Sequence, residues 1–171
     1  MKTHIIGALL LSAAAMPAVA DTALVMGSGW HDDQVNAAGP PSTGSNWTFT
    51  LSSGAHFSVS DCCNVGDVYT LTDTTHGGLG STIFLAGTGI QSTGAYGSNW
   101  TSASFSKIDK YLGAGTYAIS ISGDGAGGLP AGFGVRLDST VPEPAIWGLL
   151  IGGFVMTGAA MRRRTVATVA A

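Results

Sequence analysis

The stretch YAISISGD, residues 117–124, alternates apolar and polar side chains along its length. Tyr117, Ile119 and Ile121 fall on one face, because successive side chains of a β-strand point to opposite sides. A strand with one apolar and one polar face is typical of an antiparallel sheet that buries one side. This stretch therefore predicts an antiparallel sheet with a single buried face.

Short stretches with the same period occur on both sides of it. They are NWTFTLSS (46–53), HFSVSD (56–61), DVYTLTD (67–73), the more uniformly apolar STIFLAG (81–87), and GFGVRLD (132–138). About eight strands in roughly 120 residues predict an all-β fold, an antiparallel β-sandwich that is jelly-roll-like. Residues 103–112 are compatible with a helix, a strand or a loop.

The N-terminus has the pattern of a secretory signal peptide. A basic residue precedes a short apolar run, and the small residues Ala18 and Ala20 stand where a signal peptidase requires them. We expect residues 1–20 to be removed by cleavage before Asp21. The ectodomain then spans residues 21–140.

The expected ectodomain is acidic. It contains nine aspartates and three basic residues, which gives a net charge of −6. Proteins that bind nucleic acid gain affinity from basic contacts to phosphate, so this charge argues against a nucleic-acid partner. Only 10% of the residues in the whole chain are charged and 26 are glycine, which suits a β-rich extracellular domain.

Cys62 and Cys63 are adjacent and are the only cysteines of the chain. An exported chain meets an oxidising compartment, which favours a disulfide. However, neighbouring Cα atoms lie about 3.8 Å apart, below the usual disulfide range of roughly 4.4 to 6.8 Å. A strained vicinal disulfide, two free thiols and an intermolecular bridge therefore all remain open, and the compartment favours the vicinal bond.

Asp61, Asp67 and Asp73 recur every six residues. Carboxylate oxygens at regular spacing can bind Ca²⁺, but the compact spacing of a calcium loop is missing. Capping of turns at strand ends by the aspartate side chains is the favoured interpretation. No cysteine or histidine pair has zinc-ligand spacing, and we expect no cofactor.

His31 and Asp32 follow Trp30, and a histidine beside a carboxylate can serve acid–base chemistry. No nucleophile or metalloprotease motif accompanies them, so a solvated loop is the favoured interpretation. Trp47 and Trp100 each lie in a copy of the pentapeptide GSNWT, at 44–48 and 97–101. Both copies are predicted to start strands through the same turn chemistry, and a duplicated ligand-binding element is the alternative.

The C-terminal part combines a proline-flanked glutamate, an apolar run and an arginine cluster. Residues 145–161 contain no charge and would form a helix about 26 Å long, just enough for a thin bilayer. We expect one transmembrane helix over 145–161, followed by a short cytoplasmic tail at 165–171. The arginines would act as the membrane stop on the cytoplasmic side; they are Arg162, Arg163 and Arg164.

Val141-Pro142-Glu143-Pro144, the Gly-rich apolar helix and the arginine cluster closely resemble the PEP-CTERM sorting signal over residues 141–164. Some family labels call this segment the ice-binding protein C-terminal domain, and the label by itself does not imply ice binding. The resemblance implies that an integral-membrane exosortase recognises Pro142, Glu143 and Pro144 and cleaves there. The hosts of that family are Gram-negative bacteria that produce exopolysaccharide and biofilm.

A second resemblance concerns the ectodomain. The stretches FSVSDCCNVGDVYTLTD, LGAGTYAISISGDG and GFGVRLD resemble the FxDxF-type PEP-CTERM proteins, from which no catalytic residue carries over. We therefore expect a non-enzymatic protein that is transiently held in the inner membrane with its ectodomain in the periplasm. It would then reach the cell surface or the extracellular matrix.

The partners implied are signal peptidase, the exosortase, exopolysaccharide and the inner membrane, which the C-terminal helix would contact. The alternative is a carbohydrate- or Ca²⁺-binding envelope module that stays anchored by this helix. Its binding residues would be Trp47 and Trp100 for sugar, with Asp61, Asp67 and Asp73 for calcium.

Overall fold

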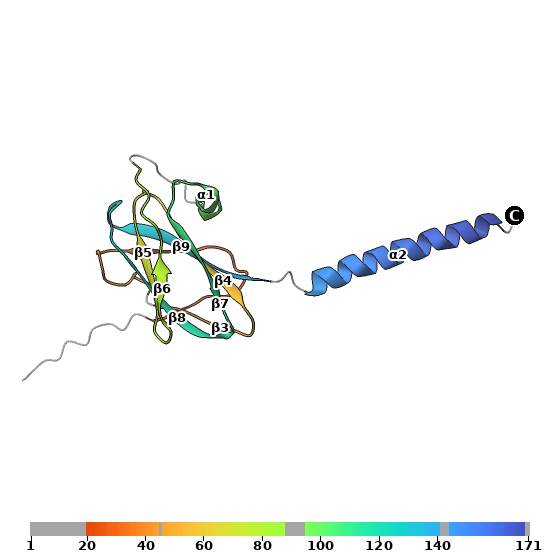
Figure 1. The fold of residues 1–171 in the computed structure, drawn as a ribbon, viewed down its shortest axis with the longest axis horizontal. Helices are drawn as coiled ribbons and strands as arrows, with labels where there is room; N and C mark the ends of the chain where they lie inside the picture. The colour runs from red at the N-terminus through yellow and green to blue at the C-terminus, as the bar shows by residue number, and fades with distance from the viewer. Residues whose placement is uncertain (1–19, 45, 88–94, 141–143, 170–171) are drawn as a thin grey trace, which may run out of the picture.

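The structure, a computed structural model, describes residues 20–44, 46–87, 95–140 and 144–169 (Figure 1). This part of the chain forms nine strands and two helices. They are β1 (Thr22–Ala23), β2 (His31–Val35), β3 (Trp47–Leu51), β4 (Ala55–Asp61), β5 (Tyr69–Asp73), β6 (Gly77–Ser81), α1 (Tyr96–Thr101), β7 (Lys107–Leu112), β8 (Gly115–Gly123), β9 (Ala131–Ser139) and α2 (Pro144–Val169).

The strands form two sheets that pack face to face as a sandwich. One sheet has the order β1-β3-β8-β5-β6, and the other has the order β2-β9-β4-β7. Neighbouring strands are antiparallel except for β1 and β3, which pair in parallel through two residues each. The expectation of an all-β sandwich is therefore confirmed for the domain.

The core lies between the sheets and follows the alternation of the sequence. Tyr117, Ile119 and Ile121 of β8 are buried, while the residues between them are partly exposed. β9 places Phe133, Val135 and Leu137 on the facing sheet in the same way. Each such side chain contributes about 1.5–3 kcal/mol when it leaves water, so these strands account for much of the stability of the domain.

The two copies of GSNWT adopt different structures. Trp47 of the first copy begins β3 and is buried in the core, whereas the second copy lies in α1. α1 packs against β4 on the outer face of the four-stranded sheet, where Asn99 Nδ2 donates to the carbonyl of Asp61 at 3.2 Å. The prediction that both copies start strands is therefore wrong for the second.

Three further segments differ from expectation. Residues 31–33, expected as a solvated loop, lie in β2, because five backbone positions of this strand pair with β9 despite the poor strand propensity of aspartate. Of the strand predicted over 81–87, only Ser81 belongs to a strand, and Ile83 and Phe84 are exposed. The ambiguous segment 103–112 becomes β7 from Lys107 onward.

The C-terminal segment forms the helix α2, which lies apart from the sandwich in Figure 1. Its side chains are described over residues 147–162, and all of these are exposed. Among the residues that the structure describes, no helix is both long enough and apolar enough to cross a membrane. The predicted helix is thus confirmed over 145–161, whereas its assignment as a transmembrane span is not supported.

Candidate functional site

The predicted processing residues lie at the ends of the described chain. Outside the described residues are Ala18, Pro142 and Glu143. Pro144 is the first residue of α2, and further along the same helix are Arg162, Arg163 and Arg164. Ala20 is exposed, and Asp21 already belongs to the domain, because its carboxylate accepts a hydrogen bond from Asn46 Nδ2 at 3.1 Å.

The three regularly spaced aspartates have separate structural tasks. Asp73 caps the turn after β5, accepting hydrogen bonds from the backbone N–H groups of Thr75 and His76 at 3.0 and 2.7 Å. Asp67 accepts from the N–H of Gly127 at 2.8 Å. In the described part of the chain, no three or more acidic, histidine or cysteine side chains are arranged to hold a metal ion. The contacts of Asp67 and Asp73 agree with the favoured interpretation that these aspartates cap turns.

Asp61 is a fully buried carboxyl at the end of β4. The hydroxyl of Tyr69 lies 3.3 Å from Asp61 Oδ1 and donates to the carbonyl of Gly132 at 2.7 Å. Burial, followed by the charge of Asp67, raises the pKa of Asp61 from 3.8 to about 7. Burial and the same two carboxyls raise the pKa of Tyr69, so its hydroxyl stays protonated at every physiological pH.

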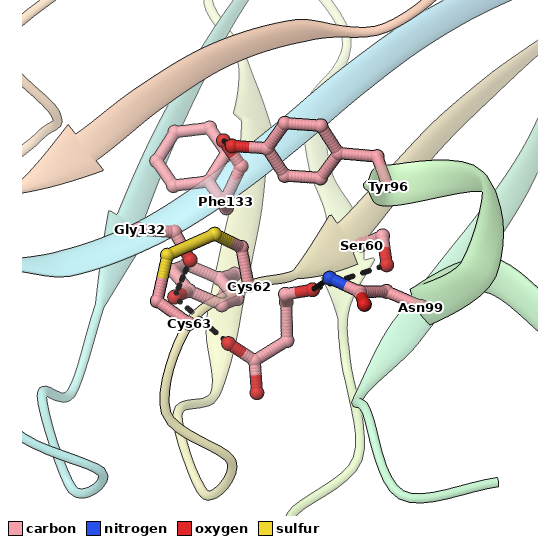
Figure 2. The surroundings of a disulfide bond; sticks show 9 residues. Ser60, Cys62, Cys63, Tyr96, Asn99, Gly132 and Phe133 are labelled. Atoms are coloured by element: carbon pink, nitrogen blue, oxygen red, sulfur yellow. Dashed lines mark hydrogen bonds between the residues drawn. A yellow bond between two sulfur atoms is a disulfide. The ribbon is translucent and has the colours of Figure 1, made fainter. Parts of the chain in front are cut away.

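Cys62 and Cys63 are bonded to each other, as Figure 2 shows. β4 ends at Asp61, and Cys63 then adopts a φ of 72°, a left-handed conformation that is uncommon outside glycine. The bonded pair lies over Gly132 of β9, where an added Cβ would lie 3.2 Å from Cys63 Sγ. Of the three states that the sequence leaves open, the structure has the vicinal disulfide.

Two glycines on the outer face of β9 make room for these groups. Gly132 lies under the disulfide, and Gly134 lies under the ring of Tyr96, where a Cβ would come within 2.5 Å of the ring. Tyr96 reaches from α1 and donates to the carbonyl of Phe133 at 3.3 Å (Figure 2). A side chain at position 134 would displace the Tyr96 ring, whereas a Cβ at position 132 would require the disulfide to shift by a few tenths of an ångström.

The next outer position of β9, Arg136, supports an aromatic cluster. Its guanidinium lies 4.7 Å from the ring centre of Trp30 and 5.7 Å from that of Trp100, within cation–π range. The two indoles are 5.5 Å apart, and Trp30 also stacks on Tyr96 at 5.8 Å. Trp47 lies in the core instead, so the two tryptophans named for the alternative sugar-binding module do not belong to one cluster.

A groove of about 400 Å³ runs along this outer face. It lies between β2 on one side and Tyr96 with the disulfide on the other. Asp32 of β2 is directly opposite Gly134, and Gln34 is directly opposite Gly132. The residues that line the groove are Asp32, Asp33, Gln34, Thr43, Cys62, Cys63, Tyr96 and Gly132.

Some of the hydrogen-bond acceptors that line the groove already accept hydrogen bonds from other groups of the protein, and others do not. Asp33 caps the neighbouring turn, since its carboxylate accepts from the hydroxyl of Thr43 at 2.9 Å and the N–H of Gly44 at 3.3 Å. Gln34 donates through Nε2 to Asn36 Oδ1 at 2.9 Å, which leaves its side-chain oxygen Oε1 as an acceptor. Asp32 is exposed, and no side chain in the described residues donates a hydrogen bond to its carboxylate.

The groove is electrostatically negative. Burial, followed by the charges of Asp32 and Asp33, raises the pKa of Tyr96 to about 12. The ring therefore faces the groove as a neutral phenol and is not a base or nucleophile at ordinary pH. Its contribution is an aromatic surface beside two carboxylates.

The histidine predicted to pair with Asp32 lies on the other side of the strand. His31 packs against Trp47 at a ring separation of 6.2 Å, and its Nε2 lies 2.7 Å from the hydroxyl oxygen of Ser28. Ser28 donates its only proton to the carbonyl of Val25 at 2.6 Å, so His31 is the donor toward Ser28. A histidine that donates cannot activate this serine as a base.

A second group combines the residue types of a hydrolase triad, but not their geometry. His56 Nδ1 lies 2.9 Å from Asp109 Oδ2, and the hydroxyl of Ser58 donates to Asp109 Oδ1 at 3.1 Å. Both partners bind the same carboxylate, so the serine proton points to the aspartate and not to the histidine. In a triad, the histidine must accept that proton.

Comparisons with known proteins are sparse. No protein-family model matches the sequence, and no curated protein matches it. One similar solved structure is the pre-peptidase C-terminal domain of a collagenase from Bacillus anthracis. It shares 10% identity with this chain, with a TM-score of 0.38, and the match covers 69% of this chain and 96% of that domain.

Sequence reasoning missed most of the groove. Tyr96, Gly132 and Gly134 have no motif of their own, because a single tyrosine and two strand glycines form no recognisable pattern. The usable signal was GFGVRLD, in which glycine occupies alternate positions of a predicted strand. Glycine inside a strand commonly marks a place where another group approaches closely.

Proposed function

We propose that this protein is an exported, non-enzymatic surface or exopolysaccharide-matrix protein that an exosortase processes at Pro142-Glu143-Pro144. The observation that supports this most directly is the independence of the domain from its tail. The last hydrogen bond of the domain runs from the hydroxyl of Thr140 to the carbonyl of Gly54 at 3.1 Å. Cleavage after this point would remove α2 without removing any residue of the core.

The exposed surface of α2 supports an association with the membrane before cleavage. Its exposed apolar side chains are Trp147, Leu149, Leu150, Ile151, Phe154, Val155, Met156 and Met161. An exposed apolar surface this large is costly in water, and contact with lipid would remove the cost. We infer that α2 retains the chain at the inner membrane until the exosortase acts, with the domain in the periplasm.

The domain itself supports a binding or structural role. We infer a jelly-roll type of sandwich, because strands that follow one another in sequence alternate between the two sheets from β2 to β5 and again from β6 to β9. Neither histidine beside a serine has the geometry of a base, which favours a non-enzymatic role. The domain would be delivered to the cell surface or matrix as a folded module.

The test is the intact mass of the protein secreted by a host that contains an exosortase. We expect the mature protein to begin at Asp21 and to lack α2. Glu143→Gln should block processing and leave the full tail on a cell-associated chain, while Asp138→Asn, a matched change inside β9, should be processed normally. Secreted protein that keeps residues 145–171 in such a host would refute the proposal.

A further inference from the structure

The groove on the outer face of the four-stranded sheet has two chemically different sides. One side offers hydrogen-bond acceptors from β2: the Asp32 carboxylate and the side-chain oxygen of Gln34. The other side offers the ring of Tyr96 and the sulfur atoms of Cys62 and Cys63. Gly132 lines the groove between them without adding a side chain, and Gly134 leaves the room that the Tyr96 ring occupies. A ligand in this groove therefore contacts acceptors on one edge and an apolar surface on the other.

A sugar ring has the matching distribution of groups. Its hydroxyls donate hydrogen bonds from the ring edge, whereas its C–H groups form apolar patches that pack on aromatic and sulfur surfaces. The groove volume of about 400 Å³ falls in the roughly 300–1,000 Å³ range of small-molecule sites.

Charge restricts the class of sugar. Asp32 and Asp33 make the groove negative, and no lysine or arginine is among its lining residues. Arg136, on the same strand as Gly132, packs against Trp30 and Trp100 and is paired with Asp138 at 2.6 Å. A uronate, sulfate or phosphate group in the groove would meet like charge. Neutral hydroxyls or a protonated amine would instead donate to the Asp32 carboxylate, in a charge-assisted hydrogen bond.

We propose that this groove binds a neutral or amine-bearing saccharide, with Asp32 and Gln34 accepting from the ring substituents and Tyr96 and the vicinal disulfide packing against the C–H surface. The inference rests on the proposed function only for the source of the ligand, since a matrix protein meets exopolysaccharide. The position of the site is set by the domain and does not depend on processing of the tail.

Binding can be measured with the full chain in detergent micelles, by calorimetry and by the fluorescence of Trp30 and Trp100, which pack beside Tyr96. The probes are a cello-oligosaccharide, a glucosamine oligomer, an oligogalacturonate of the same length, and tetralysine. We expect one of the first two to bind, and oligogalacturonate to bind at least about tenfold more weakly. Asp32→Asn should lower the affinity for the sugar that binds by about tenfold, and Gln34→Ala should lower it by a smaller factor.

The matched control is Asp109→Asn, which changes a carboxylate on the same sheet outside the groove and should leave binding unchanged. Failure of both the neutral and the amine-bearing probes overturns the proposal, as does an unchanged affinity of Asp32→Asn. Tighter binding of tetralysine than of either sugar overturns it in favour of a basic peptide. The secreted mass reports separately on sorting: a protein that binds glycan but is secreted with residues 145–171 still attached would refute the sorting proposal alone.

Discussion

Asp61 is the residue whose protonation should control the pH dependence of stability. Its pKa is about 7 in the folded domain, raised by burial and by the charge of Asp67, against 3.8 in an ordinary environment. Between these values the folded state holds a proton that the unfolded state has released. Stability should therefore be highest near pH 4, fall as the pH rises toward 7, and level off above it.

Asp61→Asn should flatten this decline, because the amide has no proton to release. The slope that it removes is at most about 1.4 kcal/mol per pH unit. Burial also raises the pKa of Asp67, so part of the slope should remain. Urea unfolding of both proteins from pH 4 to pH 8 measures the effect, and identical slopes would show that Asp61 ionises normally in the folded domain.

The pKa of Asp73 shifts in the opposite direction, and its effect on stability falls outside the range from pH 4 to pH 7. Burial alone would raise its pKa, but hydrogen bonds from Ala118, His76 and Thr75 outweigh burial and lower it. A lowered pKa gives stability that is present above pH 4 and is lost as the pH falls through the folded value. The two pH ranges do not overlap: Asp73 affects stability below about pH 4, and the decline between pH 4 and 7 is left to Asp61 and Asp67.

The two GSNWT elements test how far a short sequence determines its structure. Trp47 begins β3 and is 3% exposed, whereas Trp100 lies in α1 and is only partly buried. We expect Trp47→Ala to cost about 3–5 kcal/mol through the cavity that it leaves in the core. Trp100→Ala should cost about 1 kcal/mol, mainly the packing with Arg136 and Trp30.

Each variant serves as the control of the other, because the two substitutions are the same change in the same pentapeptide. Chemical unfolding gives both free energies of unfolding. Equal losses would mean that the local sequence, rather than its place in the fold, sets the energy of the tryptophan. The structure predicts that tertiary context decides.

The same contrast explains how much of the fold can be predicted. β3, β5, β8 and β9 follow from alternation alone, since each has one buried and one more open face. β4 alternates in residue type, although Ser58 and Ser60 on its polar face are buried as well. β2 cannot be found this way, because its two aspartates lower its strand propensity and only its pairing with β9 makes it a strand. The groove cannot be predicted from the sequence for a related reason. Tyr96 lies in the site only because Gly134, far along the chain, leaves room for its ring.

At the scale of the whole molecule, the domain should be as stable without its tail as with it. The core lies entirely in the sandwich, and every described side chain of α2 is exposed. Chains 21–140 and 21–171, the latter in detergent micelles, should therefore have melting temperatures within about 2 °C of each other. Differential scanning calorimetry measures both.

Truncation three residues earlier gives the matched control. Chain 21–137 loses Asp138 and Ser139 of β9, which pair with His56 and Ala55 of β4, and also the hydrogen bond from Thr140 to Gly54. Its melting temperature should fall by about 4–8 °C, because each kcal/mol lost shifts a domain of this size by about that amount. If 21–140 instead loses as much stability as 21–137, the tail is part of the folded unit. Removal at Pro142-Glu143-Pro144 would then destabilise the domain, and the proposal of a detachable sorting signal would lose its structural support.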